Sequence, residues 1–537
     1  MNEKIIKFWR AWGNVIVIVV GVLYFFLLAS LKNGFYVDEI FSFGHANSTV
    51  GAFMSPSIDA HFIDENKELH AKWIDNEVFR KYLMVQEGEA GNFKNIYKNL
   101  SKDVHPPFYF VLLHLSSSLF EGKLEAWAGL GLNLICLILM GVMFNRLAFL
   151  CLKDKAKANI LTGLFIFLPS VIELMVFIRM YSLFLLFNIW LCLEAVKIID
   201  DKELKVKNLI GAGIALMCSC LTHFYGLIYG FFISTGVMGV MCWDRRFRDA
   251  FKFGGVMLFG VLGTWAIFPY MVEVLLFSDR GEESLMAVRA FDPALLFFRL
   301  DYFLKQFFRA SFGAKREWHW GVMFGVFCLL MVVVRERGKR EIFDKKLAFL
   351  LWCAVMGCVV ISIVAPDMRK FSGRYYVVAV LYFILWLFMV GDKFFSVNRI
   401  RQFWGVLGIL LFMGVNMVEG AYNPYLQRDS EIQKLNEYVK DKRVVSVVSY
   451  KEVVFNYNML DSFLLTQSVY KLSADDFVEV EQFLKSNELN KGDVVILQAG
   501  MGKNVGNKKT LEKEEYRLKY KDLLFVGMFS FEIYERY

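Results

Sequence analysis

The chain has 537 residues, of which 56% are hydrophobic and 17% aromatic, and its mean hydropathy is +0.42. These values exceed the apolar share that a soluble globular protein can bury, so they exclude a wholly soluble chain and indicate a membrane protein. The formal net charge of +8 comes from Lys and Arg in short clusters between apolar runs, which is typical of membrane orientation. We therefore expect membrane lipid, and no nucleic acid, as a partner.

The N-terminus carries Lys4, Lys7 and Arg10 before an apolar run that ends at Leu31 without a small-residue cleavage site. This pattern predicts an uncleaved first membrane helix. Later apolar runs also reach the length needed to cross about 30 Å of hydrocarbon. Together they predict about eleven spans, at residues 14–31, 126–146, 158–177, 181–199, 208–222, 224–242, 253–277, 319–335, 347–365, 375–391 and 403–419.

The basic clusters between these spans predict the orientation of the chain. All of them fall on one side of the membrane if the N-terminus is cytoplasmic, and they lie at residues 146–157, 197–207, 245–252, 335–346 and 393–401. Counting the short apolar segment PPFYFVLLHLSSSLF (106–120) as a crossing would invert every later cluster. We therefore predict a helix at the outer interface there, within an outer loop 32–125 of a bacterial inner-membrane protein.

The composition becomes polar after Asn423 and Pro424. Short strand-like runs follow at 444–448, 493–497 and 523–533, and they predict a small α/β domain. The fold class expected is thus an α-helical polytopic membrane protein with juxtamembrane helices in its first outer loop and a small C-terminal periplasmic α/β domain. The predicted domains are residues 1–420, the membrane domain, and residues 421–537.

Polar residues gather at five places on the predicted outer face, where ionisable groups tend to mark function. Each place alone is typical of a helix start or an interfacial anchor. The candidate site residues are Asp38 and Glu39 after the first span, Asp103 and His105 in DVHPPFYF, Arg179 and Tyr181, His223 and Tyr225 in THFY, and Arg369, Arg374 and Tyr375. The combination offers carboxylates for general base work and cations that suit a phosphate.

This combination predicts sugar transfer from an anionic lipid. A glycosyl phosphate already has a good leaving group if Arg or Lys neutralises its developing charge, and a carboxylate then only has to deprotonate the acceptor hydroxyl. The chain has no D-x-D motif, Walker A loop or dinucleotide fingerprint, so a nucleotide-sugar donor is not expected. Asp38 and Glu39 supply too few ligands to predict a metal site, although a divalent cation stays open.

The ordered series of DE, HPP, R-x-Y, T-H-F-Y and a late R-Y resembles the protein O-mannosyltransferase and lipid A aminoarabinose transferase superfamily, membrane glycosyltransferases of the C fold. The resemblance covers about residues 14–420. It implies an inverting transferase that uses a polyprenyl-phosphate sugar, Asp38 as general base with Glu39 beside it, a pocket shaped by Asp103 and His105, and no required cofactor. It also implies that Arg179, Tyr181, His223, Arg369 and Arg374 line the site, with the arginines as phosphate ligands.

The sequence departs from the superfamily at one position. Relatives often carry an Arg near the outer start of the second span, as a ligand of the lipid phosphate, whereas EAWAGLGLN places Gly129 there. Either another Arg performs that task or the donor is held differently. The sugar is not predicted, and the acceptor is left as a protein, a lipid or another glycan.

Two alternatives remain from the sequence. An O-antigen ligase or polymerase would use a late outer loop, and the loop from Phe277 to Trp318 includes Arg280, Arg289, Arg299 and Arg309. A transporter or flippase would carry mid-span charges and repeated halves, but Glu173, Glu194 and Glu273 lie toward span ends and no internal repeat is found.

Overall fold

The computed structural model describes residues 3–52, 73–278, 293–313, 344–364, 373–395, 399–448, 460–473, 489–498, 516–520 and 531–536, apart from 102, 202, 424 and 427–429, with scattered residues between 281 and 335. The chain forms two compact units, and neither is continuous in sequence. Unit 1 comprises residues 1–30, 104–109 and 130–423, and unit 2 comprises residues 31–103, 110–129 and 424–537. The predicted division at residue 420 stays a prediction.

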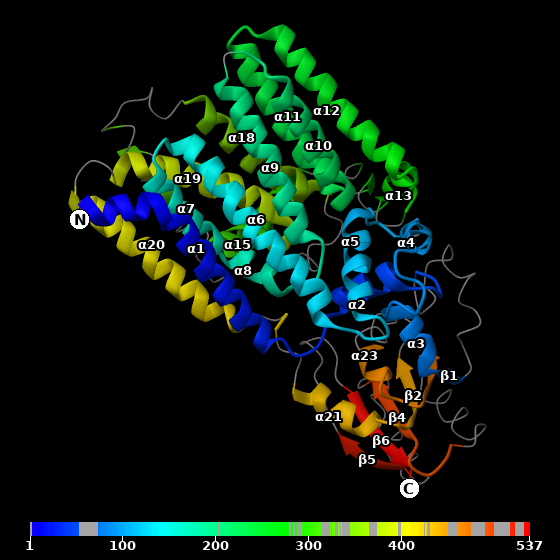
Figure 1. Ribbon diagram of the computed structural model, residues 1–537. Helices are drawn as coiled ribbons and strands as arrows, with labels where there is room; N and C mark the ends of the chain where they lie inside the picture. Colours follow the sequence, from blue (N-terminus) through cyan, green and yellow to red (C-terminus); the bar gives the residue numbers. More distant parts are fainter. Residues whose placement is uncertain are drawn as a thin grey trace. The chain divides into compact units, whose positions relative to one another are not determined.

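Unit 1 is helical, as its long apolar runs predict (Figure 1). Its helices, wholly or mainly, are α1 (Glu3–Leu31), α6 (Ala126–Leu152), α7 (Lys155–Ile166), α8 (Pro169–Val176), α9 (Tyr181–Asp200), α10 (Val206–Thr222), α11 (Tyr225–Trp243), α12 (Phe247–Ile267), α13 (Met271–Phe277), α15 (Pro293–Phe312), α18 (Lys345–Val364), α19 (Val377–Phe395) and α20 (Arg399–Gly420). A short 3₁₀ turn, η5 (Gly373–Tyr376), precedes α19.

Among the described residues, eight helices are long and apolar enough to cross a membrane, or up to nine if α7 and α8 form one bent span. The chain is therefore a membrane protein, as its composition predicted. The predicted span 208–222 corresponds to α10, a shorter apolar helix, and 253–277 is interrupted because α12 ends at Ile267. Most of 319–335 lies outside the described residues, so the count of eleven stays a prediction.

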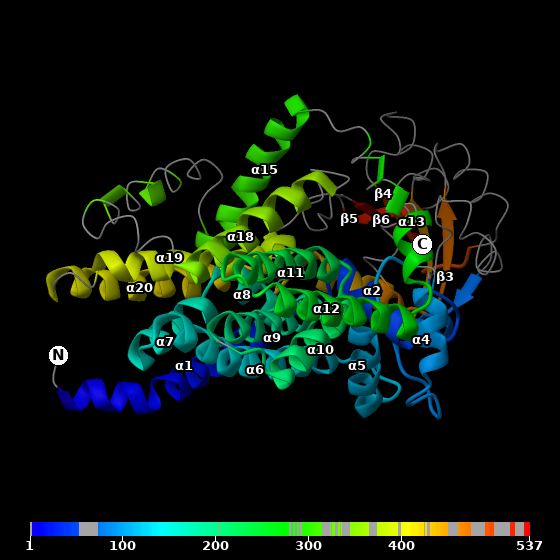
Figure 2. The ribbon, with the colours of Figure 1, turned by 90° about the horizontal axis from the view of Figure 1, so that it is seen from above.

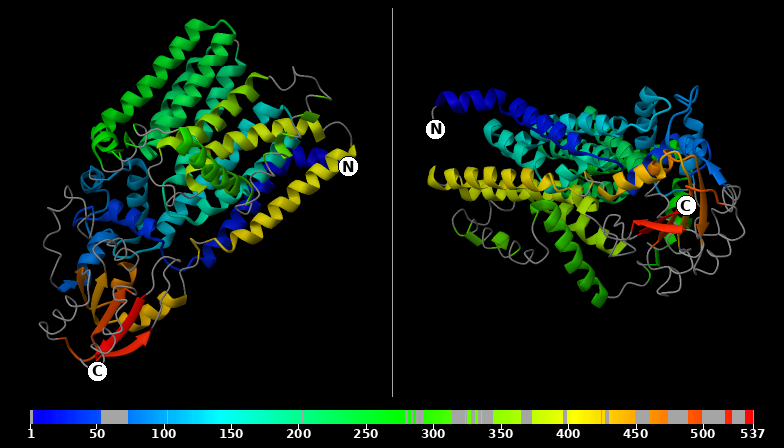
Figure 3. Two further views of the ribbon diagram at one scale, coloured as in Figure 1. Left: turned by 180° about the vertical axis from the view of Figure 1, so that it is seen from behind. Right: turned by 90° about the horizontal axis from the view of Figure 1, so that it is seen from below.

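The interior of unit 1 is organised around α9. Within its apolar stretch 83% is buried, and α9, α10, α11 and α12 lie side by side (Figure 2). By contrast, α1 and α20 run in the same direction with their C-terminal ends at one end of the unit (Figure 3), where the Tyr24 hydroxyl donates to the Met417 carbonyl at 2.7 Å. Large apolar side chains such as Leu23, Phe403 and Leu411 are exposed on them. Such exposed apolar surface suits contact with lipid.

A bend between α7 and α8 shapes one end of unit 1. The two helices meet at 59° across Phe167 and Leu168, and Pro169 occupies the first turn of α8. Proline cannot donate the backbone hydrogen bond that would continue α7, but its fixed φ suits a new helix start. The bend therefore follows from one residue. Beyond the bend, α8 runs to the short turn that joins it to α9.

The basic loops gather at the opposite end of unit 1. Asp200, at the end of α9, pairs with Lys153 at 3.0 Å and with Lys346 at 2.7 Å. Lys157 pairs with Asp392 at 2.7 Å, and Lys345 pairs with Asp244. These ion pairs bring loops that are far apart in sequence to one end of the bundle, as the charge pattern predicted. Which side of the membrane this end faces stays a prediction.

Unit 2 combines short helices with a sheet. Its helices, wholly or mainly, are α2 (Val37–Asn47), α3 (Asn76–Leu83), α4 (Phe93–Leu100), α5 (Phe108–Ser117), α21 (Ser430–Val439) and α23 (Leu460–Phe463), with a 3₁₀ turn η3 (Ser118–Phe120). Its strands are β1 (Trp73–Asp75), β2 (Arg443–Val448), β3 (Ser468–Ser473), β4 (Val494–Gln498), β5 (Tyr516–Tyr520) and β6 (Phe531–Arg536). Both α5 and η3 fall on the predicted surface helix 106–120.

The six strands form one sheet in the order β1-β3-β2-β4-β6-β5. The central strand β2 pairs in parallel with β3 and β4, and the outer pairings are antiparallel. Three consecutive residues of β2 (444–446) and three of β4 (494–496), together with Ile533 of β6, are fully buried and form its core. The tail is thus α/β as predicted, but its edge strand β1 comes from the segment 32–125 that was predicted as the first outer loop.

Candidate active site

Four loops of unit 1 carry seven of the predicted site residues. His105 precedes α5, the Arg179 turn joins α8 to α9, the His223 turn joins α10 to α11, and η5 carries Arg374. The other three members are Tyr181, Tyr225 and Tyr375. Ring contacts and a polar contact link all seven residues, and we call them the cation–aromatic cluster.

The turn that carries Arg179 is held by three hydrogen bonds from two helices. Asn133 of α6 donates to the carbonyls of Phe177 at 2.9 Å and Met175 at 3.3 Å, and Ser182 of α9 donates to the Leu174 carbonyl at 2.9 Å. These bonds satisfy carbonyls that the end of α8 leaves without helical partners. The turn therefore has a defined conformation.

Arg179 is a buried cation, with 6% of its surface exposed. Its Nη2 lies 3.4 Å from Nε2 of His105. Because a guanidinium only donates, His105 Nε2 is the acceptor in this contact, and the imidazole is then neutral with its proton on Nδ1. His105 thus orients the guanidinium without competing with it for an anion.

His223 is held as a neutral imidazole. Its Nδ1 accepts the Tyr225 backbone N–H at 3.0 Å, so the ring proton belongs on Nε2. Burial lowers the pKa of His223 well below its ordinary value of 6.5, and the positive charges of Arg179 and Arg374 lower this pKa further. His223 can therefore offer an N–H donor at neutral pH without itself being charged.

Arg374 is surrounded by aromatic faces. Its Cζ lies 5.1 Å from the ring centre of Phe177, 5.4 Å from that of Tyr375 and 5.5 Å from that of Tyr181. Rings at these distances stabilise a guanidinium through their quadrupoles and keep its plane in place. Tyr229 fixes the backbone that follows Arg374, because its hydroxyl donates to the Tyr375 carbonyl at 3.3 Å.

The cluster has the chemistry of an anion site. Two guanidinium groups can donate in pairs to phosphate oxygens, and these bonds are strong where water is excluded. The aromatic rings of the cluster meet at tilted or edge-to-face angles, and they offer faces on which a sugar ring can lie. Arg369 lies outside the described residues, and Gly129 is a buried helical residue of α6.

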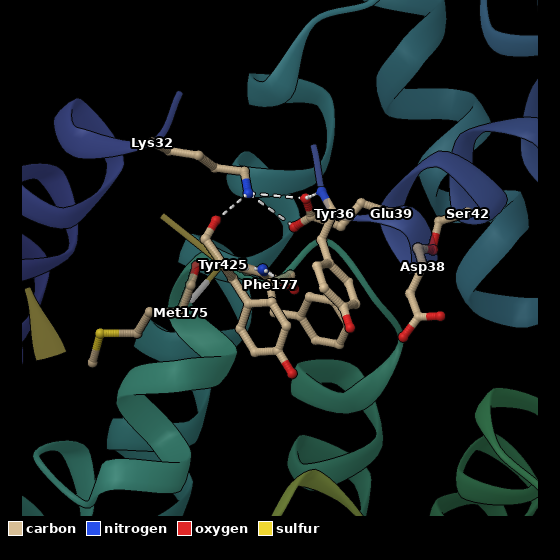
Figure 4. Close-up of polar contacts among 9 residues, drawn as sticks. Lys32, Tyr36, Asp38, Glu39, Ser42, Met175, Phe177 and Tyr425 are labelled. Atoms are coloured by element: carbon tan, nitrogen blue, oxygen red, sulfur yellow. Dashed lines mark hydrogen bonds and ion pairs between the residues drawn. The ribbon is translucent and has the colours of Figure 1, made fainter. Parts of the chain in front are cut away.

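The predicted carboxylates belong to unit 2. Asp38 and Glu39 occupy the first turn of α2, where carboxylates complement the helix dipole. Glu39 is fully buried and lies 3.0 Å from the Lys32 Nζ, and its Oε2 accepts the Tyr36 N–H at 2.7 Å (Figure 4). Asp38 is partly exposed, and its carboxyl group points away from the Lys32–Glu39 pair. The two neighbours therefore have different environments.

Asp103, the third predicted carboxylate, pairs with a buried histidine. Its Oδ2 lies 3.2 Å from Nε2 of His45, which is 2% exposed and packs edge-on against Phe110. Asp38, Ser42 and His45 follow one another at helical spacing along α2, and the Ser42 hydroxyl donates to the Asp38 carbonyl at 3.0 Å. One face of α2 therefore joins the two acidic candidates through His45.

Sequence reasoning missed Lys32 and His45. Lys32 has the pattern of a charge flanking a membrane span, and His45 is a lone histidine in a short amphipathic helix, so neither gives a local signal.

The described residues contain no group of three or more His, Cys, Asp or Glu side chains that could hold a metal ion. The described part of the chain therefore offers no set of ligands for the divalent cation that the sequence left open.

Comparison with known proteins identifies the fold. No protein-family model and no curated protein matches the chain. The solved structure of ArnT from Cupriavidus metallidurans in the apo state has a TM-score of 0.52 to this chain at 13% identity, over 97% of each chain. The same protein bound to undecaprenyl phosphate has a TM-score of 0.51 at 12% identity, also over 97% of each chain. The chain thus has the fold of this membrane protein, and the fold predicted from the motif order is confirmed.

Proposed function

We propose that the protein is an inverting glycosyltransferase that moves a sugar from a polyprenyl-phosphate donor to an envelope acceptor on the periplasmic face of the inner membrane. The cation–aromatic cluster is the observation that carries this proposal. It offers Arg179 and Arg374 to a phosphate, within a fold shared with a protein solved with undecaprenyl phosphate bound. The motif order supports the same activity.

The arginines stabilise the leaving group. As the bond between the anomeric carbon and the phosphate oxygen breaks, its electron pair stays on the lipid phosphate, and charge builds up there. Guanidinium donors already in place lower the barrier because they need no reorganisation at that moment. Arg179 and Arg374 thus take the task of the Arg that relatives carry where this chain has Gly129.

Asp38 is the proposed base. It takes the proton of the acceptor hydroxyl while the acceptor oxygen forms its bond to the anomeric carbon from the face opposite the phosphate, which inverts that centre. Its partial exposure leaves it accessible to an acceptor hydroxyl, whereas Glu39 is committed to Lys32. Asp103 and His45 shape the surroundings of α2. No metal step is required by this scheme.

The test is transfer of radiolabelled sugar from a polyprenyl-phosphate donor to acceptors in membranes that contain the wild-type chain, Asp38→Asn or Arg179→Gln. We expect each variant to lower turnover about 100-fold or more at normal protein level, the usual loss for a general base or one oxyanion donor. Arg248→Gln, an exposed arginine at the basic end of unit 1, is the matched control and keeps wild-type turnover. Undiminished transfer by Asp38→Asn would remove it as the base, and donor movement without transfer would favour a flippase.

A further inference from the structure

A buried ion pair precedes the proposed base. The side chains of Lys32 and Glu39 are 1% and 0% exposed, and the Lys32 Nζ lies 3.0 Å from both carboxylate oxygens of Glu39. Buried ion pairs are costly to desolvate, and apolar replacements are often equally stable. Fold stability alone therefore explains the presence of this pair poorly, and its other contacts indicate what else it does.

Those contacts lead to the C-terminal residues. The Lys32 Nζ also donates to the Tyr425 carbonyl at 2.9 Å, and the Asn33 N–H donates to the Leu426 carbonyl at 2.9 Å. The Tyr36 and Tyr425 rings meet edge to face, with centres 5.2 Å apart. All these residues belong to unit 2, and Figure 4 shows Lys32 between Glu39 and Tyr425. The segment before α2 is thus tied to the start of the C-terminal region.

The pair also fixes the rotation of α2. Glu39 accepts the Tyr36 N–H at 2.7 Å, which is the glutamate half of a capping box and sets where the helix begins. Successive residues of a helix point about 100° apart, so anchoring Glu39 determines the direction of Asp38. Asp38 itself points away from the pair (Figure 4). A shift of the Lys32–Glu39 pair would therefore turn Asp38, the proposed base.

We infer that Lys32, Glu39 and the Tyr425 carbonyl form a clasp through which the C-terminal region positions Asp38. This inference rests on the proposed function, because it gives the C-terminal region a task in that reaction. Lys32 and Glu39 are positioning residues here, since they act on the reaction only through Asp38.

The test compares the wild-type chain with the double variant Lys32→Met/Glu39→Gln. Each single variant would leave a buried charge without its partner and could fail to fold, whereas the double variant removes both charges and keeps the side-chain volumes. The matched control is Lys81→Met/Glu77→Gln, the same change at an exposed pair of α3 in the same unit. Two quantities are measured: kcat and KM for a polyprenyl-phosphate sugar, and amide hydrogen exchange of residues 37–47.

We expect the double variant to lower kcat about tenfold or more with KM for the donor unchanged, because misplacing a reacting group by about 1 Å can cost about 100-fold. Exchange of the α2 amides should rise in this variant and not in the control. Unchanged kcat, or unchanged exchange, overturns the clasp. If the wild-type chain transfers no sugar, the proposed function fails by itself, and the exchange result still decides whether the clasp holds α2.

Discussion

At the scale of single residues, burial decides which ionisable groups can take part in chemistry. Glu39 and Asp38 are neighbours in sequence, yet Glu39 is fully buried against Lys32 and Asp38 is partly exposed. His223 is buried and keeps a neutral ring because its Nδ1 accepts a backbone N–H. The motif residues are thus divided between groups that are held in place and groups that remain accessible to a substrate.

The neutral state of His223 has a consequence for stability. Its pKa is lowered in the folded chain, so between that pKa and about 6.5 the unfolded chain binds more protons, and stability falls as the pH falls through this range. The limiting slope for one group is about 1.4 kcal/mol per pH unit. We expect the thermal midpoint of the wild type to fall more steeply below pH 6.5 than that of His223→Gln. Above about pH 7, where both states are neutral, the two curves should run parallel.

At the scale of elements, short polar contacts between helices set the positions of the site loops. Motifs in the sequence predicted the residues of four loops that meet in the cation–aromatic cluster, and their role in a reaction stays a prediction. The contacts that hold these loops were not predictable, because Asn133 lies 42 and 44 residues from the carbonyls it binds. A lone Asn in an apolar run shows only that some polar partner is needed, and it does not identify that partner.

The substitution Asn133→Leu tests whether the bonds from Asn133 hold the Arg179 turn in place. The change removes both bonds to the carbonyls at the end of α8, and interhelical bonds of this kind contribute about 1 kcal/mol in a membrane. We expect a lower thermal midpoint together with a reduced kcat for sugar transfer, because the turn that presents Arg179 is loosened. Asn145→Leu is the control, since Asn145 of the same helix bonds to Asn159 and Thr162 at 3.0 Å. It should lower the midpoint and leave kcat unchanged, so equal kcat losses would contradict the prediction.

At the scale of the whole molecule, the chain alternates between two compact units. Long apolar runs made the helices of unit 1 predictable, and the composition change after Pro424 made the tail recognisable. The edge strand β1 could not be predicted, because three residues carry no period and their partner Tyr470 lies almost 400 residues from Trp73. The interfacial position of α5 and the orientation of the bundle still rest on charge pattern alone.

The orientation can be tested with two exposed positions in a chain whose nine cysteines have been replaced. Glu203 follows α9 at the basic end of unit 1, and Glu121 follows η3 in the predicted outer loop. We expect a membrane-impermeant maleimide to label Glu121→Cys in intact spheroplasts and Glu203→Cys only after the membrane is opened, because basic loops stay cytoplasmic. Labelling of both positions by a permeant maleimide is the control. The reverse pattern would place the basic loops outside, and the proposed periplasmic reaction would then be wrong even if the enzyme transfers sugar.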